Sequence, residues 1–237
     1  MMNIRIIGSG SYIPPHKITN ADFADHLFLD ENGQPFKQPA SVIEKFKAIT
    51  GIEERRYADA DQIYADGAGA VVVEGSTTEQ GLLSYESATY ALEEAEYLNF
   101  GSSYQQEQDP DIRYIKMKGR KIYEFALSKV PLAMQACLQK ADLDITAIKK
   151  ILIHQANEKM DEAILMRFYA LYDTVPPPDI MPMTIHTLGN SSVATIPTLY
   201  DLISRGQIDN QSLHEGDIIL FASVGAGMNI NAFVYRV

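Results

Sequence analysis

The sequence has 237 residues, 46% of them hydrophobic and 22% charged, so it is long enough to fold around a core without disulfides or metals. Its formal net charge of −11 argues against a nucleic-acid partner, because neutralising phosphates requires a basic surface. No apolar run reaches the about 18 residues of a membrane span, the N-terminus lacks a cleavage-site pattern, and a single cysteine excludes a disulfide framework. We therefore expect a cytoplasmic α/β or α+β protein that does not enter a membrane.

The first part of the chain alternates short apolar runs with turn-forming residues. Residues 3–8 (NIRIIG) predict a buried strand, and Asn20 is expected to cap a short helix beginning ADFADHLF. Residues 41–49 (SVIEKFKAI) predict a second helix, and residues 67–75 (GAGAVVVEG) a strand whose glycines allow another backbone to come close. The polar, tyrosine-rich residues 76–111 are expected to form loops or lids.

The rest of the chain has a more regular pattern. One face of a predicted helix carries apolar residues at helical spacing, with a possible kink at Pro131: Ile122, Ala126, Val130, Ala133 and Cys137. The elements predicted after it are a strand at 149–154, a helix over 160–171, a strand near 183–186, a helix from about Ser192 and strands at 217–223 and 229–237. This alternation predicts a layered α/β sheet.

The charges are unevenly distributed along the chain. Residues 84–111 contain seven acidic residues and no lysine or arginine. The next segment contains a basic block of six residues against the single acid Glu124: Arg113, Lys116, Lys118, Arg120, Lys121 and Lys129. Such a block can attract an anionic partner to an acidic protein, because steering follows the local potential. A solvated helix face is the alternative interpretation, and charge runs more often mean only that.

Two motifs place polar side chains beside predicted strands and helices. In His154–Asn157 (HQAN) an apolar strand runs into a helix, and an imidazole there can donate a hydrogen bond to a developing oxyanion or accept a proton. In residues 188–197 (LGNSSVATIP), Gly189 allows a tight approach and Asn190 lies just before a helix. A structural histidine and a simple helix cap are the alternatives.

A third motif, residues 223–229 (SVGAGMN), lies between two predicted strands. Gly225 and Gly227 flank Ala226 and indicate a turn whose backbone N–H groups could line an oxyanion hole. A plain hairpin turn explains this motif equally well when it is taken alone.

Together and in this order, the three motifs resemble the C-terminal half of β-ketoacyl-acyl-carrier-protein (ACP) synthase III, a condensing enzyme of the thiolase fold. The segments IKMKGRKIYEFAL, TGIEERR (residues 50–56) and YADGAGAVVV also resemble parts of that family. The resemblance covers nearly the whole chain. It implies a layered α-β-α architecture in which residues 1–75 are the remnant of the N-terminal half, 76–111 a loop or lid region and 112–237 a complete C-terminal half.

The resemblance also implies roles for individual residues. His154 and Asn190 would hold the malonyl thioester carbonyl and stabilise the enolate that forms as carbon dioxide leaves, and Ala226 would supply an oxyanion-hole amide between Gly225 and Gly227. Four further residues are implied to contact the substrate or the carrier protein: Gln155, Asn157, Lys159 and Arg167.

Some positions depart from the family pattern. Lys159 stands where the family often has an arginine, which keeps the charge and loses the planar fork, and Glu124 weakens the expected carrier contact. Lys45 and Ile49 replace a tryptophan and an arginine that bind the coenzyme A end in some members, so acetyl-CoA does not follow as the primer.

The family's nucleophile is a cysteine between the TGI and DGAGA segments, where this chain has only a few residues, with an apparent internal gap near Gln62–Ile63. Cys137 lies elsewhere, on the apolar face of a predicted helix, and we interpret it as a buried core thiol. Either the strands flanking the gap pair directly, or the sequence omits residues of the complete molecule. We favour the second alternative, since an excised core would expose sheet edges.

The function implied is an acyltransferase that condenses an acyl-CoA or acyl-ACP thioester with malonyl-ACP, as a homodimer without a metal or other cofactor. Two alternatives remain open. One is a non-catalytic remnant that binds acyl carrier protein or a homologous partner, and the other is a specialised secondary-metabolite ketosynthase.

Overall fold

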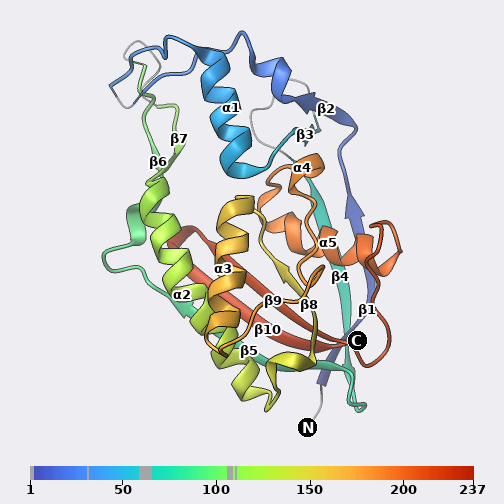
Figure 1. Ribbon diagram of the computed structural model, residues 1–237. Helices are drawn as coiled ribbons and strands as arrows, with labels where there is room; N and C mark the ends of the chain where they lie inside the picture. The colour runs from blue at the N-terminus through green and yellow to red at the C-terminus, as the bar shows by residue number, and fades with distance from the viewer. Residues whose placement is uncertain (1–2, 31, 59–65, 106–108, 110) are drawn as a thin grey trace.

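The computed structural model describes residues 3–30, 32–58, 66–105, 109 and 111–237 (Figure 1). Its largest sheet has four strands in the order β5-β10-β9-β8. Their bounds are Gly81–Thr89 for β5, Asn229–Arg236 for β10, Ile218–Gly225 for β9 and Ile148–Ile153 for β8. Neighbouring strands are antiparallel except β8 and β9, which run parallel with Ile153 opposite Ala222. The segments that follow β8 and β9 therefore leave the sheet at the same end, where the C-termini of the two strands lie.

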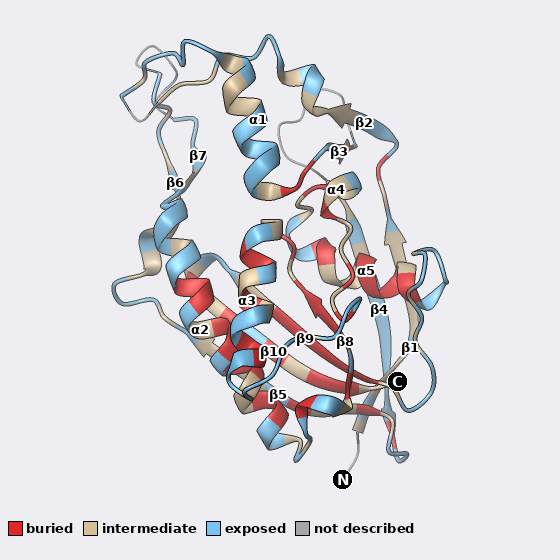
Figure 2. Ribbon diagram, viewed as in Figure 1, coloured by how far each residue is buried: buried red, intermediate tan, exposed pale blue. Residues whose placement is uncertain are grey.

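Helices cover both faces of this sheet (Figure 1). Helices α2 (Gly119–Lys140) and α3 (Glu158–Ala170) pack on one face, in a core that includes Leu220, and α5 (Thr195–Ser204) packs on the other, in a core that includes Phe221. Adjacent residues of β9 thus point to opposite layers, as the alternation of a strand requires. The buried residues gather in these layers (Figure 2), which confirms the predicted layered α/β fold.

Two N-terminal strands form a separate ribbon beside α5. Strand β1 (Asn3–Tyr12) pairs antiparallel with β4 (Ala68–Ser76). A Cβ atom on Gly69 would lie 3.1 Å from the backbone nitrogen of Thr198, so the predicted close approach of another backbone to a glycine of this strand is confirmed. The strands on either side of the suspected gap therefore pair directly. The Gln62–Ile63 join itself lies outside the described residues.

A small N-terminal lobe lies above the sheet in Figure 1. It contains the strand pair β2 (His16–Thr19) and β3 (Glu54–Tyr57), the 3-10 helix η1 (Asn20–Phe23) and helix α1 (Pro39–Thr50). The prediction that Asn20 caps a helix is wrong by one residue. Thr19 is the cap, and the Asp22 carboxylate accepts hydrogen bonds from both its N–H and its hydroxyl, at 2.7 Å each.

The prediction of loops or lids over residues 76–111 is wrong for the segment that forms β5. From Ser84 onward this strand alternates between a face turned to the core, where Ser84 bonds to α2, and a face open to solvent, so it contains too many polar residues to resemble a buried strand. The polar segment also contributes η2 (Ala95–Tyr97) and β6 (Leu98–Gly101), which pairs with β7 (Tyr114–Met117).

The strand predicted near residues 183–186 is also wrong, because the short helix α4 (Ile185–Leu188) begins there. The Gln155 side chain accepts a hydrogen bond from Thr184 N–H at 2.8 Å and holds the chain entering this helix. Three single-turn 3-10 helices complete the structure: η3 (Ile145–Ala147), η4 (Ser192–Ala194) and η5 (Ala226–Met228). Within the described ranges, no helix is long and apolar enough to cross a bilayer.

Candidate active site

His154 is the first residue after β8. It lies at the end of the sheet where the C-termini of β8 and β9 are side by side. Its backbone N–H donates to the Ala222 carbonyl at 3.0 Å, which fixes the main chain of the histidine against β9. Burial lowers the pKa of the imidazole, and a hydrogen bond with the backbone of Ser192 partly offsets that effect. The ring is therefore neutral near pH 7 and lies against the turn that contains Asn190.

Asn190 follows α4 through Gly189, whose φ of 67° is in the left-handed region that glycine tolerates. The side-chain oxygen of Asn190 accepts a hydrogen bond from Ser192 N–H at 2.9 Å. This bond accounts for the capping interpretation and orients the carboxamide, whose NH₂ group is a donor only. His154 and Asn190 come together here, because the backbone of Ser192, whose N–H donates to Asn190, also lies close enough to the His154 ring to influence its pKa.

The turn between β9 and β10 lies at the same end of the sheet. Gly225 and Ala226 are exposed, and Gly227 has a φ of 71° that favours glycine. A Cβ atom at Gly225 or Gly227 would meet no atom within 4 Å, so the space beside this turn is open. The three motifs singled out in the sequence thus gather at one end of the parallel strand pair.

The four residues predicted to contact substrate or carrier divide into two groups. Gln155 is fully buried, with its NH₂ group donating to the Pro182 carbonyl at 2.9 Å, and Asn157 caps α3 by accepting from Met160 N–H at 3.1 Å. The Gln155 amide is thus used by main chain at both ends, whereas only the oxygen of Asn157 is used in the cap; a contact of Asn157 with a ligand stays a prediction. The other two residues, Lys159 and Arg167, are cationic and are exposed on α3.

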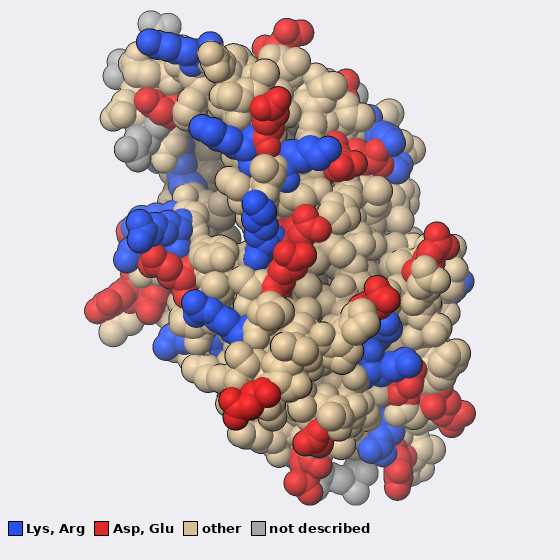
Figure 3. All heavy atoms as spheres, viewed as in Figure 1, with Lys and Arg blue, Asp and Glu red and all other residues tan. Residues whose placement is uncertain are grey.

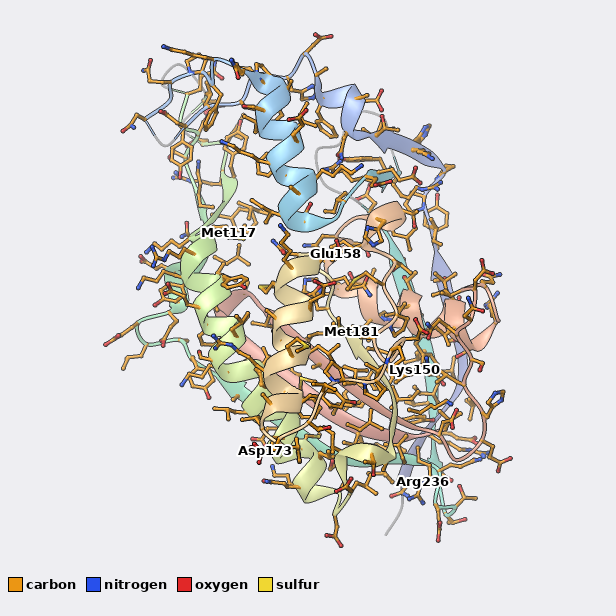
Figure 4. The ribbon with its side chains drawn as sticks, viewed as in Figure 1. Met117, Lys150, Glu158, Asp173, Met181 and Arg236 are labelled. Carbon is orange, nitrogen blue, oxygen red and sulfur yellow. The ribbon has the colours of Figure 1, made fainter. Side chains whose placement is uncertain are left out.

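One contact near the site has no signal in the sequence. His186 of α4 lies between the Gly51 carbonyl, 2.8 Å from its Nδ1, and the Glu158 carboxylate, 3.1 Å from its Nε2. Figure 4 shows Glu158 at the start of α3, directly below the end of α1. This trio joins the N-terminal lobe to the first turn after the HQAN motif.

Cys137 is fully buried on the apolar face of α2, as the sequence predicts, but it lies in the last turn of the helix and not in its middle. Its sulfur lies 3.2 Å from the Ser84 hydroxyl, which also donates to the Cys137 carbonyl at 2.6 Å. Burial is the largest influence on the thiol and raises its pKa. A neutral, enclosed thiol of this kind is a poor nucleophile.

The basic block spans β7 and the start of α2, where blue atoms gather at the left edge of Figure 3. Arg120 forms an ion pair with Glu124 at 2.9 Å, and Lys121 on the next position is exposed. Among the described residues, no group of three or more His, Cys, Asp or Glu side chains is arranged to hold a metal ion.

Comparison with known proteins bears out the resemblance stated from the sequence. Residues 138–237 match a family model described as 3-oxoacyl-ACP synthase III C terminal. A β-ketoacyl-ACP synthase III from Prochlorococcus marinus is 29% identical over 181 residues, covering 73% of this chain and 50% of the relative. The chain thus spans about half the length of the curated relatives that it matches.

Solved structures show the same fold over almost the whole chain. The 3-oxoacyl-ACP synthase III from Aquifex aeolicus aligns with a TM-score of 0.74 at 19% identity, covering 99% of this chain and 100% of that one. A priming β-ketosynthase from the R1128 polyketide pathway aligns with a TM-score of 0.78 at 16% identity, covering 99% and 96%. These likenesses confirm the predicted thiolase-like fold.

Proposed function

We propose that this chain, a relative of the β-ketoacyl-ACP synthases III, uses His154 and Asn190 to bind and decarboxylate a malonyl thioester. Acyl carrier protein is the proposed partner, and acyl and malonyl thioesters are the proposed ligands, with no resident metal or cofactor. The protein is proposed to act in the cytoplasm as a homodimer. The observation that supports this function best is the meeting of the His154 imidazole and the Asn190 turn at the backbone of Ser192.

The chemistry follows from placing two hydrogen-bond donors at one oxygen. As the bond between the malonyl carboxylate and the α-carbon breaks, carbon dioxide leaves and the electron pair moves onto the thioester oxygen. The Asn190 NH₂ group and the N–H of the neutral His154 ring donate hydrogen bonds to that oxygen, whose negative charge develops in the transition state and is complete in the enolate. With no acyl-enzyme to attack, the enolate carbon takes a proton from water, and the product is an acetyl thioester.

The reaction proposed for the complete molecule is the condensation of an acyl thioester with malonyl-ACP. Because Cys137 is buried, the 237-residue sequence by itself is expected to perform only the decarboxylation half of that reaction. Acyl transfer in this family requires an accessible thiolate, and the single cysteine of this chain is enclosed between α2 and β5. Release of carbon dioxide without formation of a β-ketoacyl product is therefore the expected outcome when malonyl-ACP and an acyl-CoA are both supplied.

The experiment that tests this function measures carbon dioxide release from carboxyl-labelled malonyl-ACP by the purified chain. His154→Ala and Asn190→Ala are each expected to lower the rate about 100- to 1000-fold, the usual effect of removing one oxyanion donor. His214→Ala is the matched control, because His214 lies in an exposed loop after α5 and its loss leaves the rate unchanged. Equal rates for all three variants would contradict the assignment of the site.

The enclosed cysteine and the basic block favour one alternative, a protein that binds acyl carrier protein without processing its cargo. Lys121→Glu in the block is then expected to weaken carrier binding, measured by calorimetry at low and moderate salt, because the contact is electrostatic. Lys149→Glu is the control, since Lys149 is an exposed residue at the start of β8, away from the block. Carrier binding with no carbon dioxide release would select this alternative.

A further inference from the structure

The N-terminal lobe contains a cavity that is open to solvent on one side and has no part in the proposed active site. Its volume is about 170 Å³, and it lies between α1, η1 and β3, lined by Asn20, Phe23, Phe28, Ile43, Phe46 and Arg55. Four of these six side chains are apolar, and three of the four are phenylalanines. An apolar cavity of about 150 Å³ in another protein is large enough to bind benzene. The size therefore suits one six-membered ring or a chain of about six carbons.

The aromatic side chains line the cavity without closing it off from solvent. The rings of Phe28 and Phe46 are tilted with centroids 6.3 Å apart, and the Arg55 guanidinium lies 4.9 Å from the centre of the Phe23 ring. Phe46 is 49% exposed, so one side of the cavity opens to solvent and a ligand can enter.

Arg55 supplies the polar end of the cavity. Its Nη1 donates to the Asn20 side-chain oxygen at 2.6 Å, and the Asn20 NH₂ group donates to the Ile52 carbonyl at 2.8 Å, so the asparagine holds the guanidinium in place. Burial lowers the pKa of Arg55 without removing its charge at neutral pH. A guanidinium kept partly from water in this way gains from a bound anion.

Within the part of the chain that the structure describes, Arg55 has no carboxylate partner, although acidic residues lie close in sequence. Glu53 pairs with Lys47 at 2.9 Å, and Glu54 pairs with Lys17 and with Arg56. Asp22 accepts hydrogen bonds from Thr19. Each nearby acid is thus engaged elsewhere, and the Arg55 fork keeps donors for a carboxylate that comes from outside.

We infer that this cavity binds a small apolar carboxylate, such as benzoate or hexanoate, with its carboxylate on Arg55 and its ring or chain among the phenylalanines. The inference does not depend on the proposed function. Ile43 and Phe46 line the cavity from α1, and Phe46 lies one turn before Ile49, so the cavity adjoins positions 45 and 49, which correspond to coenzyme A contacts in the family.

The test uses the purified 237-residue chain carrying Phe28→Trp, because the natural sequence contains no tryptophan and the new indole reports directly on the cavity. Benzoate and hexanoate are expected to change its fluorescence saturably with a stoichiometry of one. Hexanol, which lacks the charge, and acetate, which lacks the chain, are each expected to bind at least about tenfold more weakly. Equal affinity for hexanol, or for acetate, would overturn the inference.

Two variants in this reporter background separate the contribution of the Arg55 charge from that of the empty volume of the cavity. Arg55→Gln is expected to weaken hexanoate binding at least about tenfold, and Ile43→Trp is expected to abolish it by filling the cavity with the charge intact. Lys45→Gln, on the exposed face of the same helix, is the matched control and keeps full affinity. Unchanged binding by Ile43→Trp would place the ligand elsewhere and contradict the proposal even if Arg55→Gln failed to fold.

Discussion

Asp161 is an acidic residue whose surroundings disfavour its charged form. It is fully buried in α3, and neither of its carboxylate oxygens has a hydrogen-bond partner among the described residues. Burial is the largest cause that raises its pKa well above the ordinary value of 3.8. The folded protein therefore holds this proton more tightly than the unfolded chain does, and folding stability falls as the pH rises above 3.8.

This linkage predicts the effect of Asp161→Asn. In urea unfolding between pH 4 and pH 8, the natural chain loses stability with rising pH through this group, and the asparagine variant loses less, because an amide does not titrate. Asp209→Asn is the control, since Asp209 is exposed in the loop after α5, away from Asp161. The same pH dependence in the natural chain and in Asp161→Asn would contradict the account of this carboxyl.

The reactivity of Cys137 gives a second prediction at this scale. Its thiol is enclosed and burial raises its pKa, so a disulfide reagent is expected to modify it only as the protein unfolds. Ser128→Cys in a Cys137→Ala background places a thiol on the exposed side of the same helix, and that thiol is expected to react within seconds. Fast modification of Cys137 in the folded chain would show that it is accessible and reopen its role as a nucleophile.

At the scale of elements, helix α1 ends at a glycine. A residue with a side chain would be strained by the backbone conformation there and would clash with a neighbouring residue. Gly51 ends the helix with a φ of 75°, and an added Cβ would lie 2.4 Å from the Glu158 carboxylate and 2.9 Å from Glu158 Cβ. Gly51→Ala must therefore displace the start of α3 and disturb the contact with His186. Gly206 has a φ of 65° with no atom within 4 Å of an added Cβ.

These two glycines form a matched pair for thermal unfolding. Both alanine variants bear the cost of a left-handed backbone, about 1–2 kcal/mol, and only Gly51→Ala adds a steric clash. Gly51→Ala is expected to lower the melting temperature more than Gly206→Ala does. Equal losses would mean that α1 does not rest on α3 as the structure shows.

The elements also show what a sequence can and cannot predict. Strands β8 and β9 were predictable because each contains a continuous apolar run, and β10 because its buried apolar residues alternate with more exposed ones at the period of a strand. Strand β5 was not, since one of its faces meets solvent and its pairing with β10 joins residues more than a hundred positions apart. The contact of His186 with Gly51 spans 135 positions and leaves no local pattern. His154 and Asn190 were found because their motifs resemble a family, not because of their spacing.

At the scale of the whole molecule, the core is concentrated in the C-terminal half. In the described part of the chain, only Ile52 and Tyr57 among the buried hydrophobic residues precede Phe125. The β1–β4 ribbon exposes large apolar side chains such as Ile7 and Val72, which are 52% and 59% exposed. Few buried contacts imply low local stability, so the N-terminal part is the less stable region.

Hydrogen exchange measured by mass spectrometry tests this difference. Amides of α1 and the β1–β4 ribbon are expected to exchange much faster than those of β9 and α2, because local opening there exposes little buried apolar surface. Uniform protection across both halves would show that the ribbon and the lobe are stabilised by contacts beyond those described, such as a second subunit on the exposed valines.

The proposed function rests on His154 and Asn190 acting on one thioester oxygen, and a double-mutant cycle measures that cooperation directly. The rate of carbon dioxide release from malonyl-ACP is compared for the natural chain, His154→Ala, Asn190→Ala and the double variant. Because the two donors share one developing charge, the double variant is predicted to be little slower than either single variant. Strictly multiplicative losses, or a natural chain no faster than the uncatalysed reaction, would contradict the account.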